Sequence, residues 1–543
     1  MRRTGVIISV VAVVLLGGAG LVWFLARDSG PRGTAEDYLA AWSRGDFAAM
    51  RALTDGAPAD FEKRLSTMRT ELGAVKQDYT IAAFKDDGGS FNADLTLAGG
   101  RTWSYLGAFS FLERDGKWKA RWTPELLYPG LTEGQRLRTS RAWPSRAGVV
   151  AADDSTLSGP GSAGQLAGSV GPADAKTAAA LGAPYQKGDP AGLDGLQQQY
   201  EKRLAGTPAL AVQIVDAKNA VVKTLKTYGG KEGEKLVTTI DPRVQQAASQ
   251  ALKDVKKPAS VVAIRPSTGE ILAVANKPGG YNRALMGHYP PGSTFKVVTA
   301  AALVAGGMSA STKVGCPATT AVGGRTFKNY HHEDFGTIPL REAFAHSCNT
   351  TFARLAVDEL GEKRLAQVAQ QFGFNAPIIG GLPAVRAAFP DAKDATALAA
   401  ASFGQGEVLT SPLNMAAVAA AAQSGTWRSP RIVDAALAAQ AADAGGRKPE
   451  PPHKIEPAVR RALHALMPAV VSEGTAKDVS FPAGTAGKTG TAEYGSGDDP
   501  PTHAWFIGYR GDLAFAVIVE GGGTGAEAAA PVAADFLRAS RAS

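Results

Sequence analysis

The sequence predicts a multidomain chain whose C-terminal α/β domain has a sheet covered by helices. A small α+β domain and an N-terminal transmembrane helix are expected before it. Three observations support this. The chain has 543 residues, more than one hydrophobic core holds, so two to four domains are expected. Residues 5–26 carry no charge. Beyond residue 236, strand-like segments flank helical ones, so both ends should pair in one sheet.

The apolar segment at residues 5–26 is long enough to span a bilayer. Arg2 and Arg3 precede it, and positive charge favours the cytoplasmic side. The apolar run continues through residues 22–25 without the small-residue cleavage site of a signal peptide. We therefore expect an uncleaved anchor, with residues 1–4 in the cytosol and the chain after Arg27 outside. A buried N-terminal helix is the alternative.

The first outer segment, residues 33–134, predicts an α+β domain. TAEDYLAAWSRGDFAAMRALT has helical apolar spacing, and the segments after it alternate between apolar and polar residues. Asp115-Gly116 marks a hairpin turn. Residues 135–232 are rich in Gly and Ser at first, and GLDGLQQQYEKRL then predicts a helix. Neither segment contains a catalytic cluster, so we expect spacing or pedestal roles.

Residues 236–543 predict one α/β domain. ASVVAIRPSTGEILAVANKP indicates two strands around a Pro-Ser-Thr-Gly turn, and a helix should follow Ser293. A further helix is expected at about residues 456–473. AGKTGTAE, HAWFIGYR and DLAFAVIVEG indicate three strands, and a helix closes the chain. The charged, low-complexity stretch AADAGGRKPEPPHK indicates an exposed loop.

Composition restricts the partners of the chain. The net charge of +8 is mild for this length and suits an anionic outer surface. No basic cluster with interleaved aromatic residues indicates a nucleic-acid partner. Cys316 and Cys348 are the only cysteines, which is too few for a disulfide scaffold. Outside the membrane they can pair, and free buried thiols are the alternative.

The segment PPGSTFKVVTAAALVAGG offers the first candidate for catalysis. Pro and Gly mark a helix start, and residues 297–304 carry no charge, so the helix should cross a core. Ser293 and Lys296 lie three residues apart and should share a helix face. Burial of Lys296 would lower the pKa of its amine and make it a usable base. A helix N-terminus also stabilises negative charge on a reacting serine.

Two further motifs follow this pair. AHSCNTTF places Ser347 and Asn349 two residues apart, where a hydroxyl can relay a proton and an amide can hold a peptide carbonyl. A helix cap is the simpler interpretation of these two residues. AGKTGTAE predicts a strand with Thr489 and Thr491 on one face. Lys488 and Gly490 lie on the other face, where Lys attracts a carboxylate and Gly allows close approach.

Other functions are excluded by missing residues. A phosphate-binding loop around Gly487-Lys488 needs a glycine at position 482, where the chain has proline. The run His331-His332-Glu333-Asp334 lacks the H-E-x-x-H spacing of a metal site, so a polar loop is expected. No G-x-S-x-G motif is present, so a Ser-His-Asp hydrolase would lack its nucleophile.

In this order, S-x-x-K, S-x-N and K-T-G resemble the motifs of penicillin-binding proteins and class A β-lactamases. PPGSTFKVVTA, SCNTTFARLA, SFGQGEVLTSPLNMA, AGKTGTAEY and HAWFIGY all resemble a penicillin-binding transpeptidase domain, which we expect at residues 236–543. Residues 135–232 resemble the dimerisation or pedestal domain of class B members. Residues 33–134 resemble the nuclear-transport-factor-two-like (NTF2-like) domain of methicillin-resistance proteins. No glycosyltransferase segment is recognised.

The resemblance implies a membrane-anchored D,D-transpeptidase that works through a serine acyl-enzyme. Ser293 would attack the carbonyl between two D-alanines, and Lys296 would take its proton. Ser347 would relay a proton to the leaving group, and Asn349 would hold the peptide backbone. Backbone N–H groups of Ser293 and Thr491 would form the oxyanion hole.

The same resemblance assigns the K-T-G strand to substrate binding. Lys488, Thr489 and Thr491 would hold the terminal carboxylate of the donor peptide, and Gly490 would let the peptide approach. Lys488 would also keep Lys296 neutral by like-charge repulsion. No metal or organic cofactor is implied.

The implied partners are D-Ala-D-Ala stem peptides, an acceptor amine, β-lactams, the membrane, and membrane proteins of wall synthesis or cell division. Three alternatives share the motifs: a serine β-lactamase, a β-lactam sensor and a non-catalytic scaffold. The expected anchor and two extra domains argue against a β-lactamase. A sensor should carry a sizeable cytosolic part, whereas only residues 1–4 are expected inside.

Overall fold

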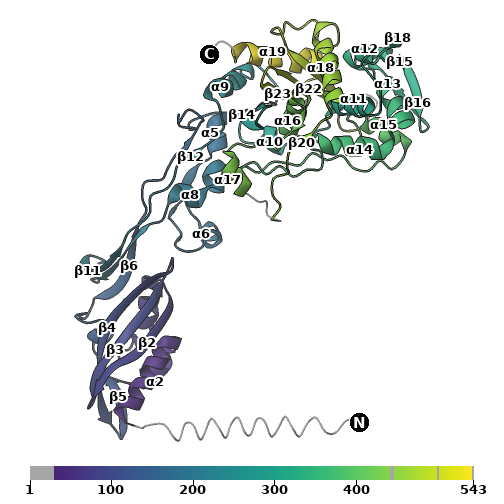
Figure 1. The fold of residues 1–543 in the computed structure, drawn as a ribbon. Helices are drawn as coiled ribbons and strands as arrows, with labels where there is room; N and C mark the ends of the chain where they lie inside the picture. The colour runs from purple at the N-terminus through teal and green to yellow at the C-terminus, as the bar shows by residue number, and fades with distance from the viewer. Residues whose placement is uncertain (1–29, 441–445, 498–499, 541–543) are drawn as a thin grey trace, which may run out of the picture. The chain divides into compact units, whose positions relative to one another are not determined.

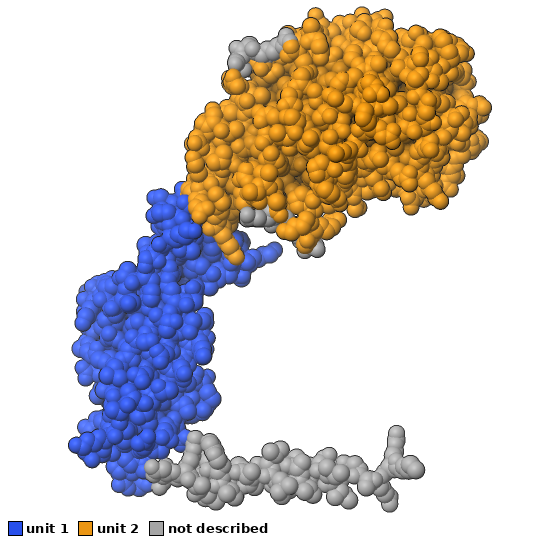
Figure 2. All heavy atoms as spheres, viewed as in Figure 1, with its two compact units in different colours: residues 1–146, 173–189, 205–233 blue, residues 147–172, 190–204, 234–543 orange. Residues whose placement is uncertain are grey.

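The structure is a computed structural model that describes residues 30–440, 446–497 and 500–540. The expected anchor at residues 5–26 lies outside the described residues. Within those residues, we find no helix with both the length and the apolar character needed to cross a bilayer. Two compact units divide the chain (Figure 2). Residues 1–146, 173–189 and 205–233 form the first, and residues 147–172, 190–204 and 234–543 form the second.

The first unit begins with helices and continues with a five-stranded sheet, as the sequence predicts. Its helices are α2 (Pro31–Arg44), α3 (Phe47–Ala52) and α4 (Phe61–Leu72). The sheet has the order β1-β5-β4-β3-β2, with β1 (Thr54–Asp55), β2 (Ala74–Lys85), β3 (Gly88–Leu97), β4 (Arg101–Arg114) and β5 (Lys117–Arg121). Trp42 of α2 stacks on Tyr79 of β2 with ring centroids 4.0 Å apart, which joins the helix to the sheet.

The hairpin predicted at Asp115-Gly116 connects β4 to β5, with Arg114 opposite Lys117. Both turn residues have positive φ, at 54° and 71°. A two-residue turn of this kind matches the twist of the flanking strands and favours Asp-Gly. The local sequence therefore sets the register of this hairpin.

A second sheet of the first unit has the order β11-β10-β6, with β6 (Arg136–Ala142), β10 (Ala209–Val215) and β11 (Val221–Tyr228). Leu137, Val212 and Ile214 from this sheet join the core of the α+β domain. The helix predicted from GLDGLQQQYEKRL is present as α7 (Gly195–Gln199) and α8 (Glu201–Ala205). The other elements of this stretch are β7 (Val149–Val150), α5 (Ser162–Ala167), β8 (Val170–Pro172), α6 (Ala175–Leu181), β9 (Pro190–Gly192) and β12 (Leu236–Val237).

The second unit contains the sheet that the sequence predicts from both ends of its last domain. Its order is β14-β13-β23-β22-β21, and every neighbouring pair is antiparallel. The strands are β13 (Ala259–Arg265), β14 (Glu270–Lys277), β21 (Ala486–Glu493), β22 (Thr502–Arg510) and β23 (Leu513–Val519). The central pair β13–β23 joins segments about 250 residues apart. The K-T-G strand β21 lies at one edge of this sheet.

Helices cover this sheet (Figure 1). Two of them, α9 (Pro242–Ala251) and α19 (Ala530–Ala539), pack together and against the sheet. Helices α16 (Pro412–Ser424) and α18 (Pro457–Ser472) also pack on its strands, and α11 (Lys296–Ala305) and α12 (Leu340–Ala345) contact α18. Residues 412–422 of α16 are all buried, which is typical of a helix that crosses a core.

Most of the remaining elements of this unit pack on α11 or on α13 (Asn349–Leu355). The other helices among them are α14 (Gly361–Gln371) and α15 (Ala395–Ala401), and the strand pairs are β15 (Lys313–Cys316) with β18 (Gly336–Pro339) and β16 (Thr319–Val322) with β17 (Arg325–Lys328). Short elements elsewhere are α10 (Arg283–Met286), β19 (Thr426–Trp427), α17 (Ala435–Gln440) and β20 (His453–Lys454). Part of the expected exposed loop, residues 441–445, lies outside the described residues.

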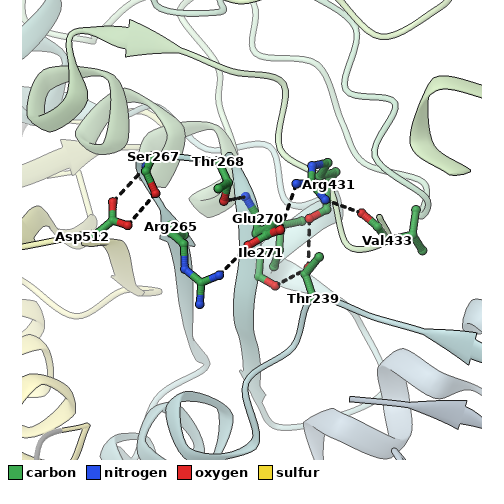
Figure 3. Close-up of polar contacts among 9 residues, drawn as sticks. All are labelled: Thr239, Arg265, Ser267, Thr268, Glu270, Ile271, Arg431, Val433 and Asp512. Carbon is green, nitrogen blue, oxygen red and sulfur yellow. Dashed lines mark hydrogen bonds and ion pairs between the residues drawn. The ribbon is translucent and has the colours of Figure 1, made fainter. Parts of the chain in front are cut away.

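A polar network holds the β13–β14 hairpin against the segment that follows α16 (Figure 3). Glu270 accepts hydrogen bonds from Arg265 at 2.6 Å and from Arg431 at 2.9 Å. The Thr239 hydroxyl donates to the carbonyl oxygens of Ile271 and Arg431. One carboxylate therefore joins two cations from distant parts of the chain.

We expect Glu270→Gln to lower the free energy of unfolding by about 2 kcal/mol, because it leaves the largely buried Arg431 without its carboxylate. Asp512→Asn is the matched control, since Asp512 is exposed and bonds the exposed Ser267. That change should stay within about 0.5 kcal/mol. Denaturant unfolding followed by circular dichroism measures both. Equal, small effects of the two substitutions would contradict the network's role.

Candidate active site

The segment that carries Ser293 is a tight 3₁₀ turn, η2 (Gly292–Phe295), which continues directly into α11. Gly292 has φ +53°, and a Cβ there would lie 2.6 Å from the carbonyl oxygen of Thr491. Its N–H donates to the Gly404 carbonyl at 2.9 Å. Trp505 Nε1 donates to the Pro290 carbonyl at 3.1 Å. The turn is therefore fixed against β21, β22 and the SFGQGE segment.

Lys296 is the first residue of α11 and is fully buried. Its Nζ donates to the Ser347 carbonyl at 2.5 Å, to Asn349 Oδ1 at 2.7 Å and to Ser347 Oγ at 3.2 Å. The rings of Phe352 and Phe403 lie 5.5 and 5.8 Å from Nζ. The hydrogen bonds of Lys296 thus go to the S-x-N segment rather than to Ser293, which the sequence placed beside it.

The surroundings of the two lysines of the site lower the pKa of both amines. Burial lowers the pKa of Lys296 well below its usual value, and the nearby charge of Lys488 lowers this pKa further. Burial also lowers the pKa of Lys488 to about 7. The lowered pKa of Lys296 favours the neutral amine, which is the form that a general base needs.

Ser347 lies between the two lysines, in the turn between α12 and α13. Its Oγ accepts hydrogen bonds from Lys488 Nζ at 2.9 Å and from Lys296 Nζ at 3.2 Å. Its φ is +60°, a strained value for a residue other than glycine, and such strain occurs at functional sites. The hydroxyl is therefore placed to pass a proton between either amine and a substrate.

Asn349 begins α13 and bonds to both neighbouring segments. Its Oδ1 accepts from Lys296, and its Nδ2 donates to the Lys328 carbonyl at 3.1 Å. An amide NH₂ has two donors, so one remains for a ligand. Cys348, the residue before it, forms a disulfide with Cys316 at the end of β15. Of the two alternatives for the cysteines, the structure contains the pair, and it braces the S-x-N turn.

The K-T-G strand β21 lies against η2. A Cβ on Gly490 would come within 2.8 Å of Thr294 Cγ2, so glycine allows this approach. The Thr489 hydroxyl lies 2.6 Å from the Thr475 hydroxyl. Thr491 is half-buried, and its Oγ1 accepts from Gly525 N–H at 3.3 Å. Lys488 is fully buried.

Ser293 is half-buried, whereas its neighbours Thr294 and Phe295 are buried. The η2 segment, the S-x-N turn and β21 enclose one site. In it, the half-buried hydroxyl of Ser293 lies one helical turn before the buried amine of Lys296. Sequence reasoning missed three contributors to this site: Thr475, Phe352 and Phe403. Phe352 and Phe403 lie in the recognised segments SCNTTFARLA and SFGQGEVLTSPLNMA, but their contact with Lys296 and the approach of Thr475 arise only through tertiary packing.

His331 and His332 lie in the 3₁₀ helix η3 (Tyr330–His332), and the acidic residues Asp334 and Glu407 lie outside helices and strands. Glu407 pairs with Lys393 at 2.9 Å, and both side chains are exposed. The carboxylate of Asp334 accepts backbone N–H groups of Ala318 and Gly336. Among residues 30–440, 446–497 and 500–540, no group of three or more His, Cys, Asp or Glu side chains is placed to hold a metal ion.

Three family models match the chain. The penicillin-binding protein transpeptidase domain matches residues 259–538, the penicillin-binding protein dimerisation domain matches residues 159–238, and the NTF2-like N-terminal transpeptidase domain matches residues 30–135.

Relatives from two mycobacterial species carry the name peptidoglycan D,D-transpeptidase PbpA. The protein from Mycolicibacterium smegmatis is 35% identical over 55% of this chain and 71% of its own length. That from Mycobacterium tuberculosis is 32% identical over 56% of this chain and 72% of its own length.

Solved structures agree with these matches. Penicillin-binding protein A from M. tuberculosis, as a ceftriaxone acyl-enzyme complex, is 30% identical over 57% of this chain and 80% of its own, with a TM-score of 0.50. A chain of a peptidoglycan synthase complex shares the fold, with a TM-score of 0.64 at 23% identity over 75% of this chain and 92% of its own.

The fold, the three motifs and these matches define a serine enzyme of the acyl-transferring kind. The chain belongs to the penicillin-binding protein transpeptidase family and is a serine D,D-transpeptidase. Its NTF2-like and dimerisation domains are those of a class B member, which confirms the resemblance inferred from the sequence. The domain boundaries expected from the sequence stay predictions.

Proposed function

We propose that the chain cross-links peptidoglycan by acyl transfer from D-Ala-D-Ala stem peptides through Ser293. Ser293 Oγ forms an ester with the penultimate D-Ala carbonyl, the peptide C–N bond breaks, and the terminal D-Ala leaves as a free amine. Lys296 takes the serine proton, and Ser347 delivers a proton to the leaving nitrogen. An acceptor amine then attacks the ester and releases Ser293.

One observation carries this proposal: Ser347 Oγ bonds both lysines, at 3.2 Å from Lys296 Nζ and 2.9 Å from Lys488 Nζ. A proton can therefore move from the base to the leaving group within one hydrogen-bonded network. Burial without a paired carboxylate keeps the pKa of Lys296 low enough for it to act as that base.

The backbone N–H groups of Ser293 and Thr491 form the oxyanion hole in this proposal. The close approach of Gly292 to the Thr491 carbonyl supports it, because it brings η2 and β21 together. One such donor is typically worth about 3 kcal/mol of the barrier. The donor's terminal carboxylate lies near Lys488 and the hydroxyls of Thr489 and Thr491, while Asn349 and Gly490 hold the peptide.

β-Lactams acylate Ser293 in this proposal, which the ceftriaxone acyl-enzyme complex of the M. tuberculosis relative supports. We place the catalytic domain outside the cell membrane, tethered by residues 5–26. Membrane proteins of wall synthesis or division are its expected partners, and its likeness to a chain of a peptidoglycan synthase complex fits this at the level of fold.

Nitrocefin separates a transpeptidase from a β-lactamase. We expect purified full-length protein to release one stoichiometric burst of colour and then turn over slowly. In the described part of the chain, none of the nearby acidic side chains, Glu333, Asp334, Glu342 and Glu407, bonds Ser293, Lys296 or Ser347 as a water-activating base would. Stopped-flow absorbance at several enzyme concentrations measures the burst. Sustained release of many equivalents per second would reject the transpeptidase in favour of the β-lactamase.

A further inference from the structure

The loop that follows α18 touches two of the three catalytic motifs through one residue. The Thr475 N–H donates to the Ala345 carbonyl at 3.1 Å, at the end of α12 and two residues before Ser347. The Thr475 Oγ1 lies 2.6 Å from Thr489 Oγ1 on the K-T-G strand. Thr475 thus connects the S-x-N turn to β21.

Gly474, the residue before Thr475, allows the loop to lie close to the end of α12. A Cβ on Gly474 would lie 2.3 Å from the Ala345 carbonyl oxygen and 2.8 Å from its carbon, both backbone atoms that cannot move aside easily. Glycine at position 474 therefore lets the loop pack directly on the end of α12. Glu473 adds an ion pair with Arg341 of the same helix.

These contacts close a ring around the site. Lys488 Nζ donates to the Thr489 carbonyl at 3.1 Å and to Ser347 Oγ at 2.9 Å. The path therefore runs from Ser347 through Lys488 and Thr489 to Thr475, and back to Ala345. Thr489 is only 5% exposed, so little water is present to satisfy its hydroxyl in place of Thr475.

We propose that Thr475 is a positioning residue that aims the Thr489 proton at the terminal carboxylate of the donor. This inference rests on the proposed function. A hydroxyl has one proton to donate, and a carboxylate can only accept. Thr489 can bind a carboxylate only by donating, so the 2.6 Å bond must be donated by Thr475. Thr475 thereby fixes the rotation of the Thr489 hydroxyl before substrate arrives.

The test uses purified full-length protein and two thioesters of benzoyl-D-alanine. One has a leaving group with a free carboxylate, and the other carries the corresponding amide. We expect Thr475→Val to lower kcat/KM about tenfold or more for the acid, since the Thr489 hydroxyl is then no longer held in the orientation that donates to the charged carboxylate. The amide should change by less than about twofold. Thr475→Ser keeps the hydroxyl and should restore the rate on the acid.

A loss of equal size on both thioesters would overturn the inference, because it indicates general damage to the site. Unchanged rates on the acid would overturn it as well. If the valine variant does not fold, Thr475→Ala removes the same hydroxyl and serves in its place. Wild-type protein that takes no fluorescent penicillin would instead reject the proposed function, so the two failures are distinguishable.

Discussion

Ser293→Ala should take up no fluorescent penicillin, whereas the wild-type chain should take up one acyl group. The chain offers two serines near the buried lysines, and Ser347 is the one hydrogen-bonded to both of them. Ser293 nevertheless fits the nucleophile better, because it lies on the turn that packs against Thr491, the proposed oxyanion-hole residue, whereas both lysines already bond Ser347 Oγ. Intact-mass spectrometry of benzylpenicillin-treated protein measures the label.

Ser347→Ala is the matched control for this experiment. It removes the proton relay and one acceptor of each lysine but leaves the nucleophile, so labelling should slow and still end at one acyl group on Ser293. Peptide mapping identifies the modified residue. Label on Ser347 in the wild-type chain, or equal labelling of Ser293→Ala and wild-type protein, would remove Ser293 from the mechanism.

Much of the fold follows from local sequence. The Asp115-Gly116 turn sets the β4–β5 register by its backbone preference, and alternation indicated the strands of the first unit. The pairing of the domain's two ends could be inferred because the long, apolar strand-like segments lie at those two ends. The three motifs could be recognised in the sequence because the catalytic chemistry requires particular residue types only one to three positions apart.

The connections between motifs could not be read in the same way. Lys488 and Ser347 are 141 residues apart, and Thr475 and Ala345 are 130 apart. No periodicity links such pairs, because tertiary packing alone brings them together. The i, i+3 rule placed Lys296 beside Ser293, yet its amine turns to the S-x-N segment, which offers three oxygen acceptors.

Lys296→Arg should slow acylation by penicillin by about a thousandfold, within the usual contribution of a general base. Arginine keeps the positive charge but does not release a proton near neutral pH. The surroundings of Lys296 favour a neutral amine, since burial and Lys488 both lower its pKa. Lys296→Met, which is uncharged and similar in length, should be acylated as slowly. It replaces the arginine variant if the larger side chain prevents folding.

The pH profile gives a second readout of the same role. In the wild-type chain the second-order rate constant of acylation by penicillin should rise with pH as Lys296 loses its proton, because the neutral amine is the base. Its lowered pKa places this rise well below the usual range of lysine. Burial lowers the pKa of Lys488 to about 7, so loss of its charge should bring the rate down again at higher pH.

In Lys296→Arg and Lys296→Met the rising limb should disappear, because neither side chain titrates in this range. The exposed Lys393→Arg is the control for a lysine substitution and should keep both rate and profile. Stopped-flow acylation between pH 5 and 10, with thermal melts of each variant, measures all of these. A well-folded Lys296→Met protein with the wild-type rate and rising limb would assign the base to another group.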